Sequence, residues 1–203
     1  MLCLTNIHSA YQEDNTNGVL EEGKSYTKLE HYWDEAYGYV YGNIDNDSFL
    51  YKYIGRVEGD EDFAGIAAAI ETAFITGRAA IVANEYNDVA TQVEILQELL
   101  SEVIGIRAVY YLEQTVANLE IAGNFADAAH DISEGYGFIY SLQFTRKPGT
   151  DDPYFTSTEV DAFIATLESG DGLWDFVDNT EALETMADSI AAKFDFTVEQ
   201  AAN

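Results

Sequence analysis

The sequence contains one segment twice, and this duplication constrains the fold more than any other feature. His31–Tyr41 and His130–Tyr140 align without a gap and share His, Glu, Tyr, Gly and Tyr at equivalent positions. An internal repeat shows which unit a fold is built from. We therefore expect a single helical domain over residues 1–203. Its pseudo-two-fold repeat would have halves at about 24–90 and 91–203.

The residue spacing within each copy is that of a helix. Residues four apart lie on one helical face, so the histidine and glutamate of a copy share a face. Gly38 and Gly137 continue this stripe. A glycine inside a helix costs about 1 kcal/mol relative to alanine, so two at matching positions indicate a structural reason. We expect both to lie where two adjacent helices cross, which would bring the two copies together.

The rest of the chain predicts an all-α fold. Period-two alternation is nearly absent, and apolar residues recur at helical spacing. The segment 42–62 has no sustained period, and within it Asp45–Ser48 reads as a turn, since Leu50 stands where a calcium loop needs glycine. The sequence favours an antiparallel bundle of four to six helices. Besides the helix of the first copy, helices are expected near residues 2–12, 63–84, 88–120, 126–144, 156–167 (capped by Thr156 or Ser157) and 180–194 (capped by Thr180).

Composition excludes several classes of partner. The formal net charge is −28, with 37 acidic and 9 basic residues. Nucleic acid needs Lys and Arg to neutralise its phosphates, and anionic membrane surfaces also attract basic residues. Cys3 is the only cysteine, so an internal disulfide is impossible. We expect neither a signal peptide nor a membrane-spanning helix in this sequence, which does not exclude export.

The duplicated segments supply two imidazoles and two carboxylates. Nitrogen and oxygen ligands of this kind suit iron or zinc. Helical bundles build metal sites from side chains on facing helices. The candidate metal ligands are His31, Glu35, His130 and Glu134.

Two arginines offer a structural alternative for the same residues. Arg78 and Arg107 lie on apolar stripes of their expected helices, and a core-facing arginine needs a carboxylate partner. Glu35 and Glu134 are the leading candidates, and the cluster would then be a buried network. Both interpretations stay open, because the arginines could also support metal ligands from behind. The residues expected around the ligands are Arg78, Arg107, Asp34, Tyr37 and Tyr136, with Trp33 and Trp174 as packing anchors.

Four segments resemble a known family. They are Tyr26–Tyr39, His130–Leu142, Gly172–Asp175 and Ile190–Phe194. Together they resemble a bacterial family of uncharacterised domains related to imelysins. The glutamate here follows its histidine by four residues, whereas the imelysin signature has three. The resemblance implies an exported, iron-associated, α-helical protein located in the periplasm or at the cell surface.

These observations lead to one expected function and two alternatives. We expect a non-enzymatic domain that binds a metal ion or a small iron-containing ligand between the repeated helices, linked to iron acquisition. One alternative is a metallopeptidase-like hydrolase, in which a His/Glu centre activates water. The other is a structural or interaction module whose repeat is purely architectural. The expected partners exclude nucleic acid and direct membrane insertion.

Overall fold

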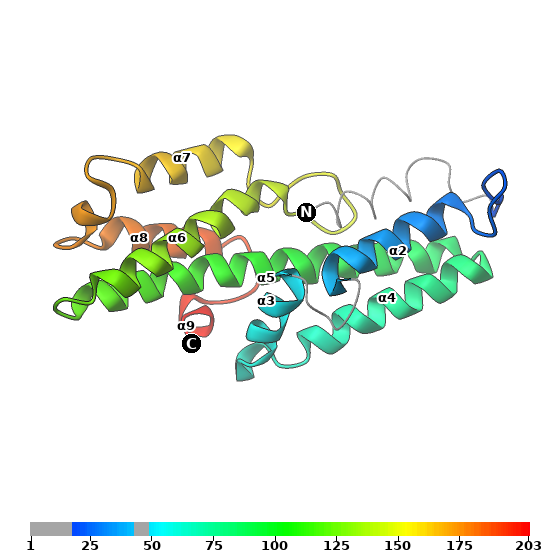
Figure 1. The fold of residues 1–203 in the computed structure, drawn as a ribbon, viewed down its shortest axis with the longest axis horizontal. Helices are drawn as coiled ribbons and strands as arrows, with labels where there is room; N and C mark the ends of the chain where they lie inside the picture. Colours follow the sequence, from blue (N-terminus) through cyan, green and yellow to red (C-terminus); the bar gives the residue numbers. More distant parts are fainter. Residues whose placement is uncertain (1–17, 43–48) are drawn as a thin grey trace. The chain divides into compact units, whose positions relative to one another are not determined.

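The fold is all-α. The computed structural model describes residues 18–42 and 49–203, which contain eight α-helices, three short 3-10 helices and no strand (Figure 1). An isolated β-bridge pairs Leu20 with Thr27. The predicted helical bundle is thus confirmed, with eight α-helices in the described residues rather than the expected four to six. The helix expected near residues 2–12, the turn at Asp45–Ser48 and Cys3 lie outside the described residues.

The chain divides into two compact units. The first comprises the described residues up to Leu100 together with Arg146–Asp152. The second comprises Ser101–Thr145 and Pro153–Asn203. Helix α5 (Tyr86–Glu120) contributes its first part to the first unit and the remainder to the second. The proposed repeat halves stay a prediction.

The first unit contains α2 (Lys28–Tyr41), α3 (Phe49–Glu58), α4 (Ile66–Ala83) and the 3-10 helix η1 (Glu61–Phe63). α2 packs on both α3 and α4. Thr27 begins α2 with a capping box, since its hydroxyl accepts the Glu30 amide and the Glu30 carboxylate accepts the Thr27 amide. Such a cap satisfies amides at the start of a helix that lack an intrahelical acceptor.

Helix α3 corrects the expectation that residues 42–62 are irregular. Tyr53, Ile54 and Val57 are at most 2% exposed. Their spacing of one and three residues is helical, but the pattern covers only ten residues and contains Gly55. A helix this short is marginal by itself, and tertiary burial of its apolar face rather than intrinsic propensity stabilises it.

The packing of α2 on α4 is centred on Trp33. Its side chain is 2% exposed, and its indole Nε1 donates to the carbonyl of Phe74 at 3.0 Å. A Cβ atom added to Gly77 would lie 2.1 Å from Cζ2 of the indole ring. Gly77 therefore makes room for Trp33, which is a packing anchor as predicted.

The loop Arg146–Asp152 is linked to the first unit through the buried side-chain amide of Gln97. Gln97 is fully buried on α5, and its Oε1 accepts the Gly149 amide at 3.1 Å. Its Nε2 donates to the carbonyl of Thr150 at 3.4 Å. A buried amide side chain must have partners, so this loop and α5 hold one another in place.

The second unit follows the predicted helices closely. Thr156 caps α7 with a capping box, as expected. Thr180 precedes α8 but makes no side-chain cap, because its hydroxyl donates to the Glu184 carboxylate at 2.9 Å. Trp174 is 60% exposed, so its predicted role as a packing anchor is wrong. The helices are α6 (Phe125–Ser141), η2 (Leu142–Phe144), α7 (Ser157–Leu167), η3 (Gly172–Phe176), α8 (Glu181–Ala191) and α9 (Val198–Ala201).

Gly38 and Gly137, the glycines that the two copies share, do not mark a close helix approach. A Cβ atom added to Gly38 or Gly137 would meet nothing within 4 Å. The close approaches occur at other glycines, where the added atom would lie 2.1–3.1 Å from an aromatic residue. These pairs are Gly77 with Trp33, Gly105 with Phe194, and Gly135 with Tyr111. The sequence pattern thus predicted a close approach of two helices at a glycine, but at Gly38 and Gly137, where it does not occur.

We expect Gly77→Ala to lower the free energy of unfolding by about 1–3 kcal/mol, the usual cost of overpacking a core. Gly38→Ala is the matched control, because it adds the same atom to open space on α2. It should raise stability by up to about 1 kcal/mol through helix propensity. Urea unfolding followed by circular dichroism measures both. Equal effects of the two substitutions would show that Trp33 does not depend on Gly77.

Candidate functional site

The first pair of predicted metal ligands lies on the surface of α2. His31 Nε2 and Glu35 Oε1 are 3.5 Å apart, with side chains 44% and 42% exposed. The imidazole stacks on the ring of Tyr26, with centroids 5.4 Å apart. This pair is therefore not part of a buried network.

The second pair lies on α6 in the other unit. His130 is exposed and Glu134 is half-buried. Because the pairs belong to different units, their convergence on one ligand stays a prediction. Within residues 18–42 and 49–203, no group of three or more His, Cys, Asp or Glu side chains is arranged to hold a metal ion.

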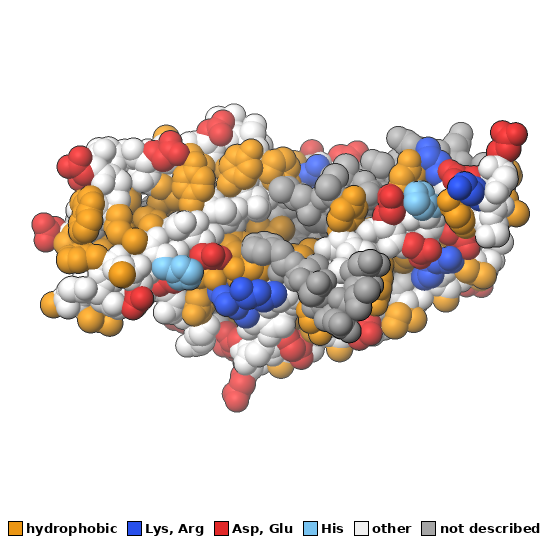
Figure 2. All heavy atoms as spheres, in the orientation of Figure 1, with side chains coloured by type: hydrophobic (Ala, Val, Ile, Leu, Met, Phe, Trp, Pro, Cys, Tyr) orange, Lys and Arg blue, Asp and Glu red, His pale blue; other side chains and the backbone are white. Residues whose placement is uncertain are grey.

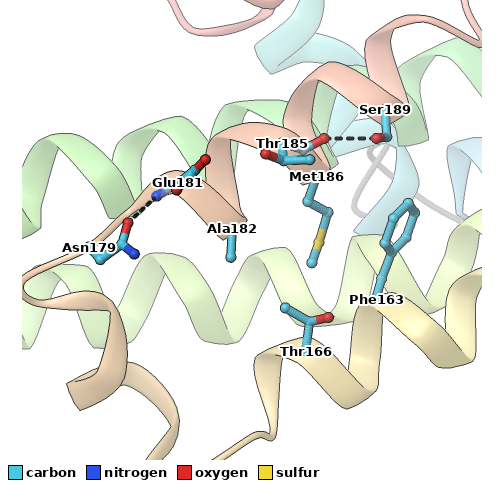
Figure 3. A pocket seen from close by; sticks show the side chains of 8 residues that line it. All are labelled: Phe163, Thr166, Asn179, Glu181, Ala182, Thr185, Met186 and Ser189. Atoms are coloured by element: carbon cyan, nitrogen blue, oxygen red, sulfur yellow. Dashed lines mark hydrogen bonds between the residues drawn. The ribbon is translucent and has the colours of Figure 1, made fainter.

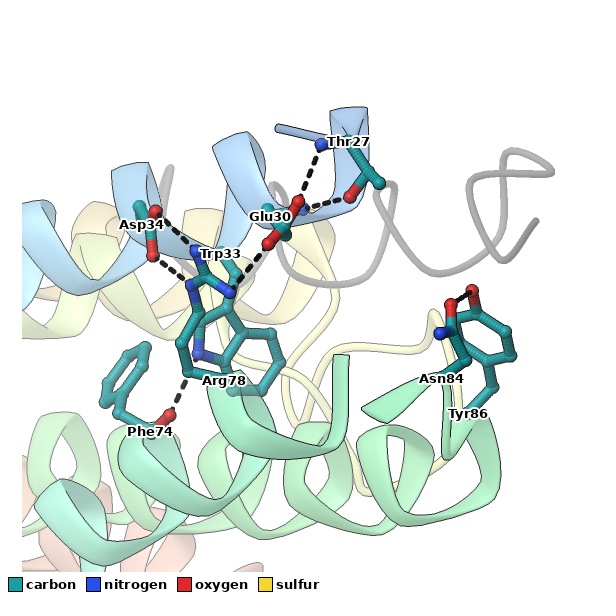
Figure 4. Close-up of polar contacts among 8 residues, drawn as sticks. All are labelled: Thr27, Glu30, Trp33, Asp34, Phe74, Arg78, Asn84 and Tyr86. Atoms are coloured by element: carbon teal, nitrogen blue, oxygen red, sulfur yellow. Dashed lines mark hydrogen bonds and ion pairs between the residues drawn. The ribbon is translucent and has the colours of Figure 1, made fainter. Parts of the chain in front are cut away.

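Arg78 has different partners from the predicted one. Its Nε donates to Asp34 Oδ1 at 2.8 Å and its Nη1 to Glu30 Oε1 at 3.0 Å (Figure 4). Its side chain is 33% exposed and pairs with two carboxylates of α2, as expected, but these are Glu30 and Asp34 rather than Glu35. The correction has a simple cause: Glu30 and Asp34 are one helical turn apart and face α4, whereas Glu35 faces solvent.

Glu30 links this ion pair to the start of α2. The pKa of its carboxyl lies below the ordinary value, chiefly because the Thr27 amide donates to it, with the Arg78 guanidinium adding to the effect. The carboxylate thus stays charged at neutral pH while serving both the cap and the ion pair. The predicted neighbour Asp34 belongs to the same cluster.

Arg107 lies in the core of the second unit, as predicted. It is 5% exposed, and its guanidinium carbon lies 3.8 Å from the ring centroid of Tyr110 and 4.6 Å from that of Tyr111. Stacking on aromatic faces suits the weakly hydrated guanidinium. Its pairing with Glu134 stays a prediction.

The two predicted tyrosines have separate environments. The Tyr136 hydroxyl donates to Glu168 at 2.7 Å, and this hydrogen bond raises the pKa of Tyr136. Tyr37 stacks on Tyr41, with centroids 4.5 Å apart, and is 39% exposed. Tyr37 therefore presents part of its ring to solvent beside α4.

An apolar groove lies between α2 and α4 in the first unit. Its volume is about 590 Å³, within the range of ligand-binding clefts. Ile75 and Val82 are 60% and 63% exposed, so the groove is open to solvent. Apolar and acidic side chains adjoin along these helices in Figure 2. The lining residues are Trp33, Asp34, Tyr37, Phe74, Ile75, Arg78, Ala79 and Val82.

Sequence reasoning missed this groove, although α4 carried a signal for it. The helix is apolar on nearly all sides, and a helix of that kind is either fully buried or has an apolar face available to a partner. The row of α4 that includes Ile70 and Phe74 is buried within the unit. The outer row of Ile75, Ala79 and Val82 is equally regular.

The same composition makes α4 resemble a membrane helix. Among the described residues, the stretch Glu61–Ala83 is long and apolar enough to cross a membrane, by length and composition alone. The core helix of a soluble protein satisfies the same criterion. Seven residues of α4, among them Ile70 and Phe74, are buried within the unit.

A second, smaller cleft lies between α7 and α8. Its volume is about 390 Å³ (Figure 3). The hydroxyls of Thr166 and Ser189 on its walls donate to carbonyls of their own helices. These groups are thus already satisfied locally, and the cleft gathers no charged cluster. It is lined by Phe163, Thr166, Asn179, Glu181, Ala182, Thr185, Met186 and Ser189.

Carboxylates converge on Glu113 in the second unit. The pKa of Glu113 is raised, first because burial desolvates its carboxylate and then because three other carboxylates repel its charge. A carboxyl whose folded-state pKa exceeds its unfolded value lowers stability as pH rises through that window. The repelling groups are Glu184 and Asp188 on α8 and Glu199 on α9.

Glu113→Gln should therefore raise the free energy of unfolding at pH 7, where the wild-type carboxylate is charged. At pH 4, below the ordinary carboxyl pKa, the gain should shrink because the glutamate is mostly protonated in both states. Glu120→Gln, an exposed position on the same helix, is the control and should change little at either pH. Urea unfolding at the two pH values measures this. An equal gain at both would contradict the electrostatic origin.

The fold and the groove define the chain as an all-α domain with one open apolar face on its first unit. A family model described as Domain of unknown function (DUF4856) matches residues 6–197, and the chain belongs to this family. No curated protein and no solved structure matches the chain. The match shows no link to imelysins, so that relationship stays a prediction.

Proposed function

We propose that this chain is a non-enzymatic binding domain that takes an apolar segment of a partner protein in the groove between α2 and α4. The observation that supports the proposal is the exposed outer row of α4. In a strongly acidic chain, Ile75 and Val82 stand open beside Tyr37 rather than being covered by charged side chains. Contiguous exposed apolar patches rimmed by polar residues are typical of interaction sites.

The openness of the groove favours a protein segment over a small molecule. Small-molecule sites enclose most of their ligand, whereas three lining residues here are 39–63% exposed. Covering Tyr37, Ile75 and Val82 would contribute about 3 kcal/mol, taking part of the roughly 1.5–3 kcal/mol for full burial of each side chain. A contribution of this size suits a reversible contact.

The charged residues of the groove favour binding rather than catalysis. Asp34 and Arg78 are its charged lining residues, and they pair with each other. An acid or base for catalysis must be placed to exchange a proton with a substrate at a suitable pKa. The Asp34 carboxylate is instead engaged by the Arg78 guanidinium at 2.8 Å.

The test uses a labelled helical peptide with Leu and Ala on one face and Gln and Ser on the other. We expect saturable binding by fluorescence anisotropy, weakened at least tenfold by Ile75→Ser combined with Val82→Ser. Ile121→Ser is the control, because Ile121 is 57% exposed in the second unit. It should leave the affinity unchanged. Absence of saturable binding, or equal loss in the control, would overturn the proposal.

A second candidate function is metal binding at the duplicated segments, as the resemblance to imelysins implies for an exported protein of iron acquisition. The supporting observation is the exposed His31–Glu35 pair, whose 3.5 Å separation allows both side chains to contact one ion. Imidazole and carboxylate suit zinc or iron, with water completing the coordination. The extracytoplasmic location stays a prediction of the same resemblance.

Metal binding should raise the unfolding midpoint as Zn(II), or Fe(II) without oxygen, is added, because the ion favours the folded state. His31→Gln alone should abolish this rise if α2 provides the site. If the two pairs converge, His130→Gln should abolish it equally. Gln keeps the hydrogen-bonding capacity but is a poor ligand, so circular dichroism should be unchanged. No shift with either metal would exclude this function.

A further inference from the structure

We propose that the segment bound by the groove is a basic amphipathic helix of another protein. This inference rests on the proposed function of the groove and adds the conformation and charge of the partner. Two observations carry it: the spacing of the exposed apolar residues on α4 and the charges that border them.

The spacing fits a helical occupant. Ile75, Ala79 and Val82 lie at positions i, i+4 and i+7 of α4, and with a rise of 1.5 Å per residue they span about 10 Å. Two turns of a partner helix cover the same length. Laying the apolar face of an amphipathic helix into such a groove is a recurring mode of recognition, read through anchors at these spacings.

The two helices that form the groove are acidic. α2 and α4 carry four carboxylates, namely Glu30, Asp34, Glu35 and Glu71, against Lys28 and Arg78. Arg78 already pairs with two of the carboxylates, so this trio has a net negative charge. The Asp34 side chain is 59% exposed and keeps acceptor capacity toward solvent. Glu71 is exposed one turn before Ile75 on the same row of α4.

This charge distribution selects among the possible occupants. A second copy of the chain also carries a net charge of −28, so association of two copies is opposed by repulsion. Anionic membrane surfaces are opposed for the same reason. Lys and Arg flanking an apolar ridge would meet Asp34 and Glu71, and opposite charge raises both association rate and specificity.

The experiment compares two labelled helical peptides with the same Leu and Ala face, one carrying Lys and Arg and the other Glu on the polar face. The basic peptide should bind at least tenfold more tightly than the acidic one at about 0.05 M salt, and the difference should shrink at about 0.5 M as charges are screened. Glu71→Gln combined with Asp34→Asn should weaken only the basic peptide. Glu98→Gln, an exposed glutamate on α5, is the control.

The outcomes separate this inference from the function on which it rests. Equal binding of both peptides, abolished by Ile75→Ser with Val82→Ser, would overturn the basic partner and leave the groove as a binding site. If neither charged peptide binds, and the neutral peptide with Gln and Ser on its polar face does not bind either, both the basic partner and the binding function of the groove are overturned. Concentration-dependent dimerisation in sedimentation experiments, or binding to vesicles of anionic lipid through Ile75 and Val82, would replace the partner helix by that occupant.

Discussion

The contact between Trp33 and Gly77 determines how the first unit is arranged. A glycine on α4 lets the indole ring reach the helix surface, where its Nε1 hydrogen-bonds the Phe74 carbonyl. Carbonyls inside a helix already accept an intrahelical bond, so this one uses its second lone pair. The arrangement fixes the rotation of α2 against α4. That rotation in turn places Asp34 beside Arg78 and Tyr37 at the edge of the groove.

The ion pair and the groove depend on the same helix face. Glu30 and Asp34 of α2 pair with Arg78 of α4. One turn earlier on α4, Phe74 makes edge contacts with the rings of both Trp33 and Tyr37. A surface salt bridge alone contributes little to stability. Here it holds the guanidinium of Arg78 against α2, and Arg78 lines the groove together with Ile75 and Val82.

The sequence predicted most helices well because they are long segments bounded by turn and loop residues. α4, α5 and α7 lie within a few residues of their expected positions. α3 was missed because it is short, contains Gly55 and follows a stretch rich in Gly, Asn and Asp, although its apolar residues share one face. The groove was missed because one row of a helix is expected to face the core and the remaining rows are expected to face solvent. On α4 both rows are apolar, and only the packed structure shows which is covered.

The partners of Arg78 could not be predicted from residue types alone. Glu35 was chosen because it belongs to the duplicated motif, yet duplication does not report the rotation of a helix about its axis. Trp33 sets that rotation, and it places the faces of Glu30 and Asp34 toward α4. A single tertiary contact thus decided between carboxylates that are equivalent in sequence.

The duplicated segments share a buried face but differ in how that face is packed. Leu29, Ala36 and Val40 of α2 are buried, and so are Ala128, Gly135 and Ile139 at the equivalent positions of α6. The duplicated sequence therefore encodes which side of each helix turns inward. On α2 the large side chain of Trp33 packs against Gly77 of α4. On α6 the glycine belongs to the duplicated segment itself, where Gly135 packs against Tyr111.

The histidine and glutamate of each copy lie off the buried face of their helix. Their positions alternate with the buried ones, so neither copy places its histidine in the core: His31 is half-exposed and His130 exposed. A pair kept for packing would lie on the inward face. The two histidines, which recur off the buried face of both helices, are the residues of the repeat that a ligand or partner can reach.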